Sequence, residues 1–220
     1  MIARVTWISR STVRDWLKPQ AGVRQWRAPQ LSLASLPERE CAYLLGFYLG
    51  DGSISTHLRR VYKLRIVCDS QYTTIIDECV AAMQAVMPHN RVSVQRLPYN
   101  AVVIGCYSKN WPLLFPQHGR GRKHERKIEL ASWQKEIVDR FPREFLRGLI
   151  HSDGCRVLNR VNGKDYPRYF FSQVSDDIRS LFCETCDLLG VQWRLNRWNS
   201  VSIARAPSVA ILDSFIGPKS

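Results

Sequence analysis

Two aspartates stand near the ends of two short stretches that share one pattern. Residues 44–52 have the sequence LLGFYLGDG and residues 146–154 have the sequence LRGLIHSDG. Both fit the frame L-x-G-φ-φ-x-small-Asp-Gly, where φ is apolar or aromatic. Apolar and small residues in one run are typical of a tightly packed helix, and the final glycine favours the end of that helix. Asp51 and Asp153 are therefore predicted to be carboxylates at helix C-termini.

Small residues recur four positions apart in each stretch. The pairs are Gly46 with Gly50 and Gly148 with Ser152. Residues at this spacing lie on one face of a helix, so a second backbone can approach that face closely. We expect the two helices to pack side by side in the same direction and in register, with Gly46 and Gly148 at their interface. The two aspartates would then be neighbours.

Two carboxylates at adjacent helix C-termini are unfavourable on their own. Like charges repel, and the negative ends of the two helix dipoles add to the repulsion. A bound divalent cation would remove this cost. Carboxylate oxygens suit Mg²⁺, with backbone carbonyls and waters as further ligands. Asp51 and Asp153 are therefore predicted to bind Mg²⁺, for which Mn²⁺ can substitute.

The two stretches resemble the LAGLIDADG motif of the DOD-type homing endonucleases, in the form with two motifs in one chain. The matching positions are Gly46, Asp51, Gly52, Gly148, Asp153 and Gly154. The resemblance covers residues 36–217. It departs at Leu49 and His151, which occupy the first acidic position of the motif, a position that does not bind metal in this family.

This resemblance implies an α+β fold made of two αββαββα repeats related by a pseudo-twofold axis. Their sheets would form a saddle over duplex DNA, and the activity would be hydrolysis of both strands at a specific site. Asp51 and Asp153 would hold the metal, with the carbonyls of Gly50 and Ser152 as further ligands.

Members of the family also place a basic residue near the active centre. A basic, glycine-containing run at residues 118–127 follows the first unit. By its place in the fold Lys123 resembles that catalytic lysine, and Lys127 is the second choice. The alternative is a linker that lies on phosphates, and Arg120, Arg122 and Lys127 are predicted DNA contacts.

Exposed faces of the sheet strands are expected to contact the bases, because a two-stranded ribbon fits the major groove. Some of these side chains would hold phosphates and position the protein without specifying sequence. The candidates are Lys63, Arg65, Gln95, Arg156, Arg168, Gln173, Arg194, Asn196 and Arg197.

Behind each motif the residue periods change in the same order. In the first half we predict a strand at 63–67, a helix at 72–87, a hairpin at 91–95 and 101–107, and a helix ending near 115. In the second half we predict strands at 155–161 and 168–174, a helix at 177–189, a hairpin at 192–198 and 200–205, and a helix at 208–215. The capping-box spacing of Ser35 and Glu38 predicts the start of the first motif helix.

These elements predict four segments along the chain. Residues 1–34 are a helix-turn-helix-like arm and linker, 35–118 the first repeat, 119–142 a basic linker and 143–220 the second repeat. Residues 7–17 resemble the recognition half of a helix-turn-helix, and a basic amphipathic arm is the alternative. Either would contact phosphates.

The charge balance favours a polyanionic partner. There are 32 Lys and Arg residues against 19 Asp and Glu, a net charge of +13, which favours duplex DNA. No apolar run approaches the roughly 20 residues that cross a bilayer, and no signal peptide is apparent. Seven cysteines do not form a disulfide framework in a chain of this length. We expect a monomer in the cytoplasm, associated with the nucleoid.

Two other functions remain open. A DNA-binding transcriptional regulator could retain the same scaffold without cleavage, and the helix-turn-helix-like arm favours this alternative. An RNA-binding splicing helper is a third possibility. The presence of both Asp51 and Asp153 favours the endonuclease, since a pure binder gains nothing from two carboxylates close to phosphates.

Overall fold

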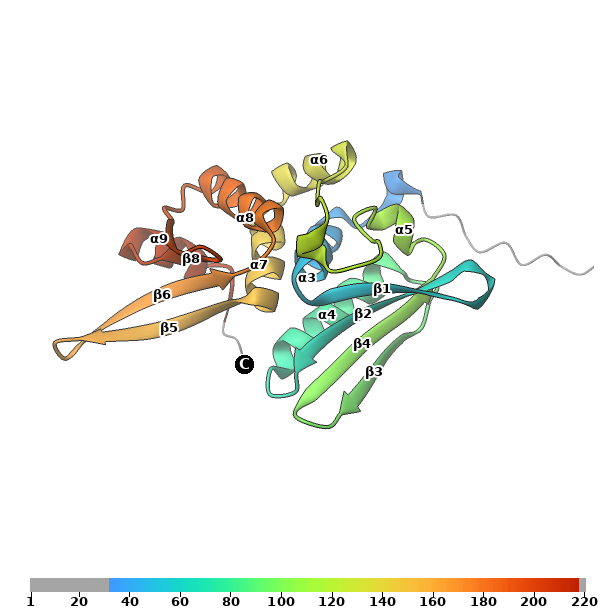
Figure 1. Cartoon of the computed structure of the whole chain (residues 1–220), viewed down its shortest axis with the longest axis horizontal. Helices are drawn as coiled ribbons and strands as arrows, with labels where there is room; N and C mark the ends of the chain where they lie inside the picture. The colour runs from blue at the N-terminus through green and yellow to red at the C-terminus, as the bar shows by residue number, and fades with distance from the viewer. Residues whose placement is uncertain (1–31, 218–220) are drawn as a thin grey trace, which may run out of the picture. The chain divides into compact units, whose positions relative to one another are not determined.

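The computed structural model describes residues 32–217. These residues form two four-stranded antiparallel sheets and seven α-helices, so the predicted α+β fold is confirmed (Figure 1). The first repeat contains α3 (Glu38–Asp51), β1 (Gly52–His57), β2 (Val61–Asp69), α4 (Thr73–Val86), β3 (Val92–Leu97), β4 (Ala101–Ser108) and α5 (Trp111–Leu114). Next come α6 (Ser132–Arg140), α7 (Pro142–Asp153), β5 (Gly154–Val161), β6 (Lys164–Ser172), α8 (Asp176–Leu188), β7 (Arg194–Arg197), β8 (Ser200–Ile203) and α9 (Ala206–Asp213).

The two sheets have the same topology. Their strand orders are β1-β2-β4-β3 and β5-β6-β8-β7, with every neighbouring pair antiparallel. The glycine that ends each motif opens the first strand of its sheet: Gly52 pairs with Ile66, and Gly154 pairs with Phe171. The backbone therefore repeats its path behind each motif.

Alternation along the central strands explains how the sheets bury one face. In β2, Leu64 and Ile66 are buried and Arg65 between them is exposed. In β6, Tyr169 and Phe171 are buried on the corresponding face. These apolar faces join the helices in one core that includes both repeats.

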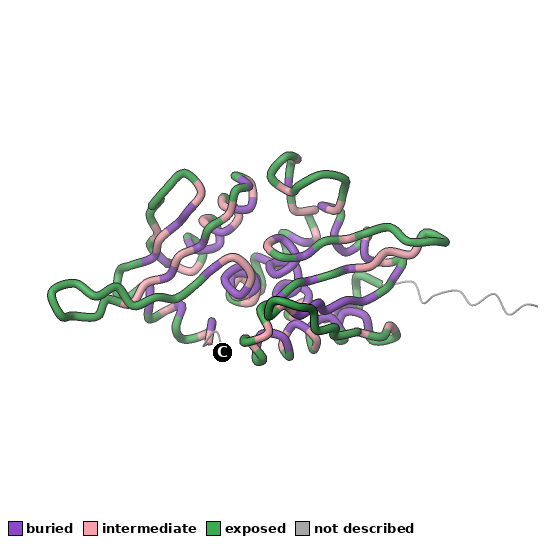
Figure 2. The backbone as a smooth tube through the Cα atoms, turned by 60° about the horizontal axis from the view of Figure 1, so that its bottom comes forward, coloured by how far each residue is buried: buried purple, intermediate pink, exposed green. Residues whose placement is uncertain are grey.

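α3 and α7 pack side by side between the two sheets, and both are largely buried (Figure 2). A Cβ atom added to Gly46 would lie 2.3 Å from the carbonyl oxygen of Phe145. A Cβ atom added to Gly148 would lie 2.2 Å from the carbonyl oxygen of Tyr43. The two backbones are thus in direct contact in a parallel arrangement, and this contact leaves no room for a side chain at either glycine.

Two local expectations need correction, and the predicted linker between the repeats has secondary structure of its own. The capping box at Ser35 is wrong: α3 begins after Pro37, and the Ser35 hydroxyl donates to the carbonyl of Ser32 (3.2 Å). Part of the segment between the repeats is helical, since it contains α6. The strand predicted to begin at Arg168 begins at Lys164, because main-chain pairing with β5 extends the hairpin through polar residues that carry no apolar alternation.

Helix lengths bear on the membrane question. Across residues 32–217, none of the helices has the length and apolar character that spanning a bilayer requires. The helix-turn-helix-like segment at residues 7–17 lies outside the part of the chain that the structure describes.

Candidate active site and nucleic-acid interface

The two motif aspartates are the last residues of α3 and α7. The last turns of these helices are in close contact, since a Cβ atom added to Gly50 would lie 2.1 Å from Ser152 Oγ and 2.8 Å from Asp153 Oδ2. The fold therefore brings the end of α3 directly against the Asp153 carboxylate. Gly50 permits this approach because it has no side chain.

Lys123 connects the segment between the repeats to the end of α3. It begins a short 3₁₀ turn, Lys123–Glu125, and its Nζ donates to the carbonyl oxygens of Tyr48 (2.5 Å), Leu49 (2.9 Å) and Gly50 (2.7 Å). These carbonyls belong to the last turn of α3, where backbone donors run out: Tyr48 still accepts from the Gly52 N–H, whereas Leu49 and Gly50 lie beyond that last bond. The ammonium group thus caps α3 and neutralises part of its negative dipole.

Both aspartates act on this ammonium group. Burial lowers the pKa of Lys123 to about 8, while the negative charges of Asp153 and Asp51 oppose that shift. Burial disfavours a charged amine, and nearby carboxylates favour it. The structure therefore brings together Asp51, Asp153 and Lys123, the three residues that sequence reasoning placed in the catalytic centre.

The oxygen atoms at this centre fit a hard divalent cation only in part. Two carboxylates and main-chain carbonyls are suitable ligands for Mg²⁺. However, the described residues contain no group of three or more His, Cys, Asp or Glu side chains that could hold a metal. The Gly50 carbonyl, a predicted ligand, also accepts a hydrogen bond from Lys123. A bound cation would complete its coordination with water or substrate oxygens.

Arg126 is a second cation beside this centre that sequence reasoning did not single out. Burial raises the pKa of Tyr48 to about 12, and the charge and hydrogen bond of Arg126 act in the opposite direction. The Lys123 ammonium lies 5.0 Å from the centroid of the Tyr48 ring. The only available signal for Arg126 was its place in the basic run at residues 118–127.

Gln173 lies at the centre and not on an exposed strand face. It follows β6, and its Nε2 donates to Asp153 Oδ2 (2.7 Å). Its Oε1 accepts from the backbone N–H of Ser175 (3.2 Å), which fixes the amide orientation. Gln173 was predicted as a DNA contact, whereas its position suits orientation of the Asp153 carboxylate.

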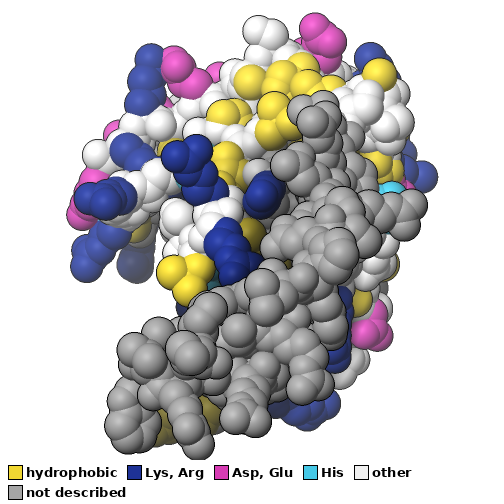
Figure 3. Space-filling view, turned by 90° about the vertical axis from the view of Figure 1, so that its right-hand side faces the viewer, with side chains coloured by type: hydrophobic (Ala, Val, Ile, Leu, Met, Phe, Trp, Pro, Cys, Tyr) yellow, Lys and Arg dark blue, Asp and Glu magenta, His cyan; other side chains and the backbone are white. Residues whose placement is uncertain are grey.

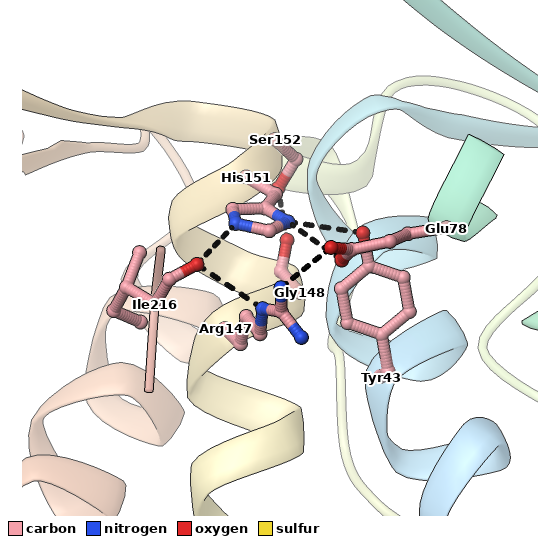
Figure 4. Close-up of polar contacts among 7 residues, drawn as sticks. All are labelled: Tyr43, Glu78, Arg147, Gly148, His151, Ser152 and Ile216. Carbon is pink, nitrogen blue, oxygen red and sulfur yellow. Dashed lines mark hydrogen bonds and ion pairs between the residues drawn. The ribbon is translucent and has the colours of Figure 1, made fainter. Parts of the chain in front are cut away.

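A partly buried polar network holds α7 just before Asp153 (Figure 4). His151 Nε2 donates to the carbonyl oxygen of Ile216 (2.9 Å), so the ring proton is on that nitrogen. His151 Nδ1 lies 3.0 Å from the Tyr43 hydroxyl and 3.8 Å from Glu78 Oε2. Arg147 donates to Glu78 Oε1 (2.6 Å) and to the Ile216 carbonyl (3.1 Å). The network links α7 to α3, to α4 and to the segment after α9.

One face of the first sheet carries three of the predicted DNA contacts. Lys63, Arg65 and Gln95 line a hollow of about 350 Å³ together with residues of β1. The Lys63 stem lies across Gly105, where an added Cβ atom would be 2.8 Å from Lys63 Cε, and its ammonium is 5.0 Å from the Tyr107 ring centroid. This face is polar, partly cationic and accessible.

The second sheet presents a similar group. Arg168, Arg194 and Asn196 line a hollow of about 920 Å³ along β7 and the end of α8. The Nε atom of Arg168 is buried and has no hydrogen-bond partner in the described part of the chain. Arg197 is exposed at the end of β7, next to an irregularity in its pairing with β8. Figure 3 views the molecule from the side of the first repeat, and there several Lys and Arg side chains lie on the left flank of the surface.

Arg156 lies on the opposite face of the second sheet. It pairs in register with buried Tyr169, and its guanidinium donates to both carboxylate oxygens of Asp213 (2.8 and 2.9 Å) in α9. Strand parity explains the difference from the prediction: Arg156 is two residues after buried Gly154, so it shares the helix-facing side. Arg156 attaches α9 to the sheet and does not lie on the face of Arg168.

The remaining predicted contacts lie in the loop before α6. Arg120, Arg122 and Lys127 are exposed. Lys127 forms an ion pair with Glu129, which reduces the positive charge that it presents. Of this basic run, Lys123 and Arg126 are the cations that turn inward.

The sequence matches no protein-family model and no curated protein. Among solved structures, mesophilic variants of the homing endonuclease I-DmoI share the fold at a TM-score of 0.55 and 14% identity, over 82% of this chain and 91% of that chain. I-DmoI in complex with DNA and Mn matches at a TM-score of 0.54 and 14% identity, over 82% and 98%. The N-terminal LAGLIDADG domain of DUF199/WhiA matches at 0.53 and 16% identity, over 84% and 88%. The two repeats described above therefore have the LAGLIDADG fold.

Proposed function

We propose that this protein is a site-specific endonuclease that hydrolyses both strands of duplex DNA with a divalent metal ion, acting as a monomer. The observation that carries the proposal is the meeting of three charged groups at one point. Asp51 and Asp153 end two adjacent helices. Their negative charges favour the protonated form of Lys123, which extends from the segment between the repeats to the end of α3. A purely structural helix pair has no need of two carboxylates at this position.

Each group has a role in phosphodiester hydrolysis. Asp51 and Asp153 would hold Mg²⁺, which supplies Lewis-acid polarisation of the phosphoryl oxygens and activation of water. Lys123 and Arg126 would stabilise negative charge that develops on the phosphate in the transition state. Gln173 would keep the Asp153 carboxylate in one orientation through its 2.7 Å hydrogen bond.

The DNA-binding part of the proposal rests on charge and on the two sheet faces. The chain has a net charge of +13, and cations that neutralise phosphates supply most of the non-specific affinity for DNA. Lys63, Arg65 and Gln95 on one sheet, with Arg168 and Arg194 on the other, would contact the duplex. I-DmoI, which has the same fold, has been crystallised in complex with DNA and Mn or Ca.

The test is cleavage of a randomised duplex library with Mg²⁺, followed by sequencing of the new ends. Asp51→Asn and Asp153→Asn should each lower cleavage by about a thousandfold or more, because each removes a metal-binding charge. DNA affinity should change little. The matched control is Asp139→Asn, which removes an exposed carboxylate that pairs with Lys135 on α6. This variant should cut at the wild-type rate. Cleavage at the wild-type rate by either aspartate variant would overturn the assignment.

One observation favours a second candidate, a DNA-binding protein that does not cut. Lys123 offsets part of the charge of the two carboxylates and donates to the Gly50 carbonyl, so the protein supplies a cation of its own at this centre. Such a protein would retain duplexes from the library but produce no new ends with Mg²⁺ or Mn²⁺. The same experiment therefore distinguishes the two functions.

A further inference from the structure

The turn between β1 and β2 has an unusual backbone for its residues. The three-residue tip Leu58–Arg60 joins the strands, and Arg59 (φ 61°) and Arg60 (φ 55°) are both in the left-handed region. Residues other than glycine and asparagine rarely adopt this conformation, because their Cβ atom crowds the backbone. Strained residues of this kind persist where another requirement holds them.

The corresponding turn of the second repeat uses residues that suit the conformation. Between β5 and β6 the two turn residues are Asn162 (φ 51°) and Gly163 (φ 76°). Asn-Gly is the pair most favoured in two-residue hairpins. The same chain thus makes one hairpin turn with an unstrained pair and the other with two arginines, so the arginines bring a property that asparagine and glycine lack.

That property is unneutralised positive charge. Arg59 and Arg60 are exposed, and within residues 32–217 neither forms an ion pair or a side-chain hydrogen bond. In the second repeat, by contrast, Arg160 near the tip is paired with Asp165 at 2.9 Å, which leaves Lys164 as the exposed cation beside that turn. The first hairpin therefore presents the stronger positive charge at its end.

The position of the tip extends a surface already described. His57, the last residue of β1, lines the hollow that contains Lys63, Arg65 and Gln95. The tip follows His57 directly, and the β1–β2 hairpin projects beyond the other two strands of its sheet (Figure 1). A duplex lying on this sheet face would pass the arginines as it leaves the sheet.

We propose that the Leu58–Arg60 tip binds the phosphate backbone of duplex DNA outside the segment covered by the first sheet, and that the β5–β6 tip makes no contact of equal strength. The protein would therefore hold more of the flanking duplex on the side of its first repeat. This inference rests on the DNA-binding part of the proposed function and is independent of cleavage.

The experiment measures stability and DNA affinity in the full chain, with a pool of random-sequence duplexes as the probe. The variant R59N/R60G gives the first tip the dipeptide of the second. Its melting temperature should rise, because two strained residues are removed. Its affinity should fall several-fold, and the slope of log K against log salt should decrease in magnitude by about 2, one for each phosphate that is no longer neutralised.

Two further variants separate charge from strain. R59Q/R60Q removes the charge and keeps side chains in the left-handed region, so it should bind more weakly without gaining stability. R59K/R60K keeps the charge and should retain both affinity and salt slope. The control R39Q/R143Q removes two positive charges near the starts of α3 and α7, at the helix ends opposite the aspartates, and should leave the slope unchanged.

The outcomes are distinguishable. If the wild-type protein binds duplex DNA and R59N/R60G keeps the same affinity and slope, the tip contact is overturned while the proposed function stands. If the wild-type protein does not bind duplex DNA at all, both proposals fail. A loss of affinity in R39Q/R143Q equal to that in R59N/R60G would also overturn the tip contact, because net charge alone would then explain the effect.

Discussion

The two repeats share a backbone but differ in the side chains around their aspartates. Gly52 pairs with Ile66 and Gly154 with Phe171. Two residues after Ile66 the first repeat has the buried thiol of Cys68. Two residues after Phe171 the second repeat has Gln173, whose amide donates to Asp153. Pseudo-symmetry therefore describes the path of the chain and not its chemistry.

The last turns of α3 and α7 also have different hydrogen-bond partners. The last carbonyls of α3 accept hydrogen bonds from Lys123, which belongs to the segment between the repeats. On α7, the Ser152 hydroxyl donates to the carbonyls of Gly148 and Leu149 within the same helix. A distant ammonium group therefore binds the end of α3, whereas the Ser152 hydroxyl near the end of α7 bonds back to carbonyls one turn earlier in its own helix. In a nuclease, such a difference predicts unequal rates for the two DNA strands.

The largest expected effect tests the contact between α3 and α7, to which both repeats contribute a glycine in the same way. Gly46→Ala and Gly148→Ala each place a Cβ atom within 2.3 Å of a backbone oxygen of the partner helix. Because backbone cannot move aside as a side chain can, each should lower the free energy of unfolding by about 3 kcal/mol. Chemical denaturation measures this loss.

Gly163→Ala is the control for the glycine substitutions. Gly163 has φ 76° and no atom within 4 Å of an added Cβ, so only backbone strain of about 1 kcal/mol is expected. If Gly46→Ala and Gly148→Ala differed strongly from each other, the helix interface would not be symmetric. If both were as mild as the control, the close backbone contact would be wrong.

The next effect concerns the position where one repeat has Leu49 and the other has His151. His151→Leu removes the donor to the Ile216 carbonyl and the partner of the Tyr43 hydroxyl. The Tyr43 hydroxyl would lose its partner at His151, and the Ile216 carbonyl would keep the hydrogen bond from Arg147 but lose the one from His151. The free energy of unfolding should therefore fall by about 2 kcal/mol. His151→Gln, which can still donate to Ile216, should recover part of that loss. Equal stability of His151→Leu and the wild type would show that the network does not stabilise the fold.

A smaller effect sharpens the chemical difference between the repeats. Gln173→Ala releases the Asp153 carboxylate from its 2.7 Å hydrogen bond. We expect cleavage of one strand to slow by about tenfold, the loss of roughly one hydrogen bond to a charged group. Nicked plasmid should then accumulate before linear product. Cys68→Ala, at the corresponding position of the first repeat, should cut both strands as the wild type does, and an identical product ratio in both variants would argue against an asymmetric centre.

The smallest effect is a pH dependence of stability in the second repeat. The hydrogen bond from Arg156 lowers the pKa of Asp213 below its ordinary value. A carboxylate with a lowered folded-state pKa stabilises the protein above its unfolded pKa, and this contribution is lost as the pH falls through the folded value. The groups are largely exposed, so the contribution is below about 1 kcal/mol. In thermal melts, the Asp213→Asn variant should lose less stability on acidification than the wild type does. Parallel curves of melting temperature against pH for the two proteins would contradict the assignment.

Periodic patterns in the sequence predicted much of the fold and the pairing of the two motifs. The alternation around Leu64 and Ile66 predicted β2, and the glycine spacing predicted parallel packing of the motif helices. The face of the sheet on which a strand residue lies was harder to predict. Arg156 faces α9 because β5 begins at Gly154, and the sequence did not show where that strand begins. The predicted DNA contact at Gln173 likewise depended on a strand end that the sequence placed two residues too late.

Polar residues of the candidate site were less predictable than the core. Lys123 was singled out only through the family resemblance, since nothing in residues 118–127 indicates which cation turns inward. Arg126 was missed for the same reason. Burial of a cation depends on the carbonyls and carboxylates that surround it in three dimensions, and the carbonyls around Lys123 come from residues more than 70 positions away.

The capping of α3 by Lys123 has a consequence for any attempt to produce the two halves as separate chains. The first half carries Asp51, but its helix end is completed by a residue that lies beyond the last strand of its sheet. A break placed before Gly119 would remove the Lys123 ammonium from the carbonyls of Tyr48, Leu49 and Gly50, whereas a break between Leu130 and Ser132 would keep the ammonium group with α3. Division of the chain should therefore follow the lysine and not the edge of the sheet.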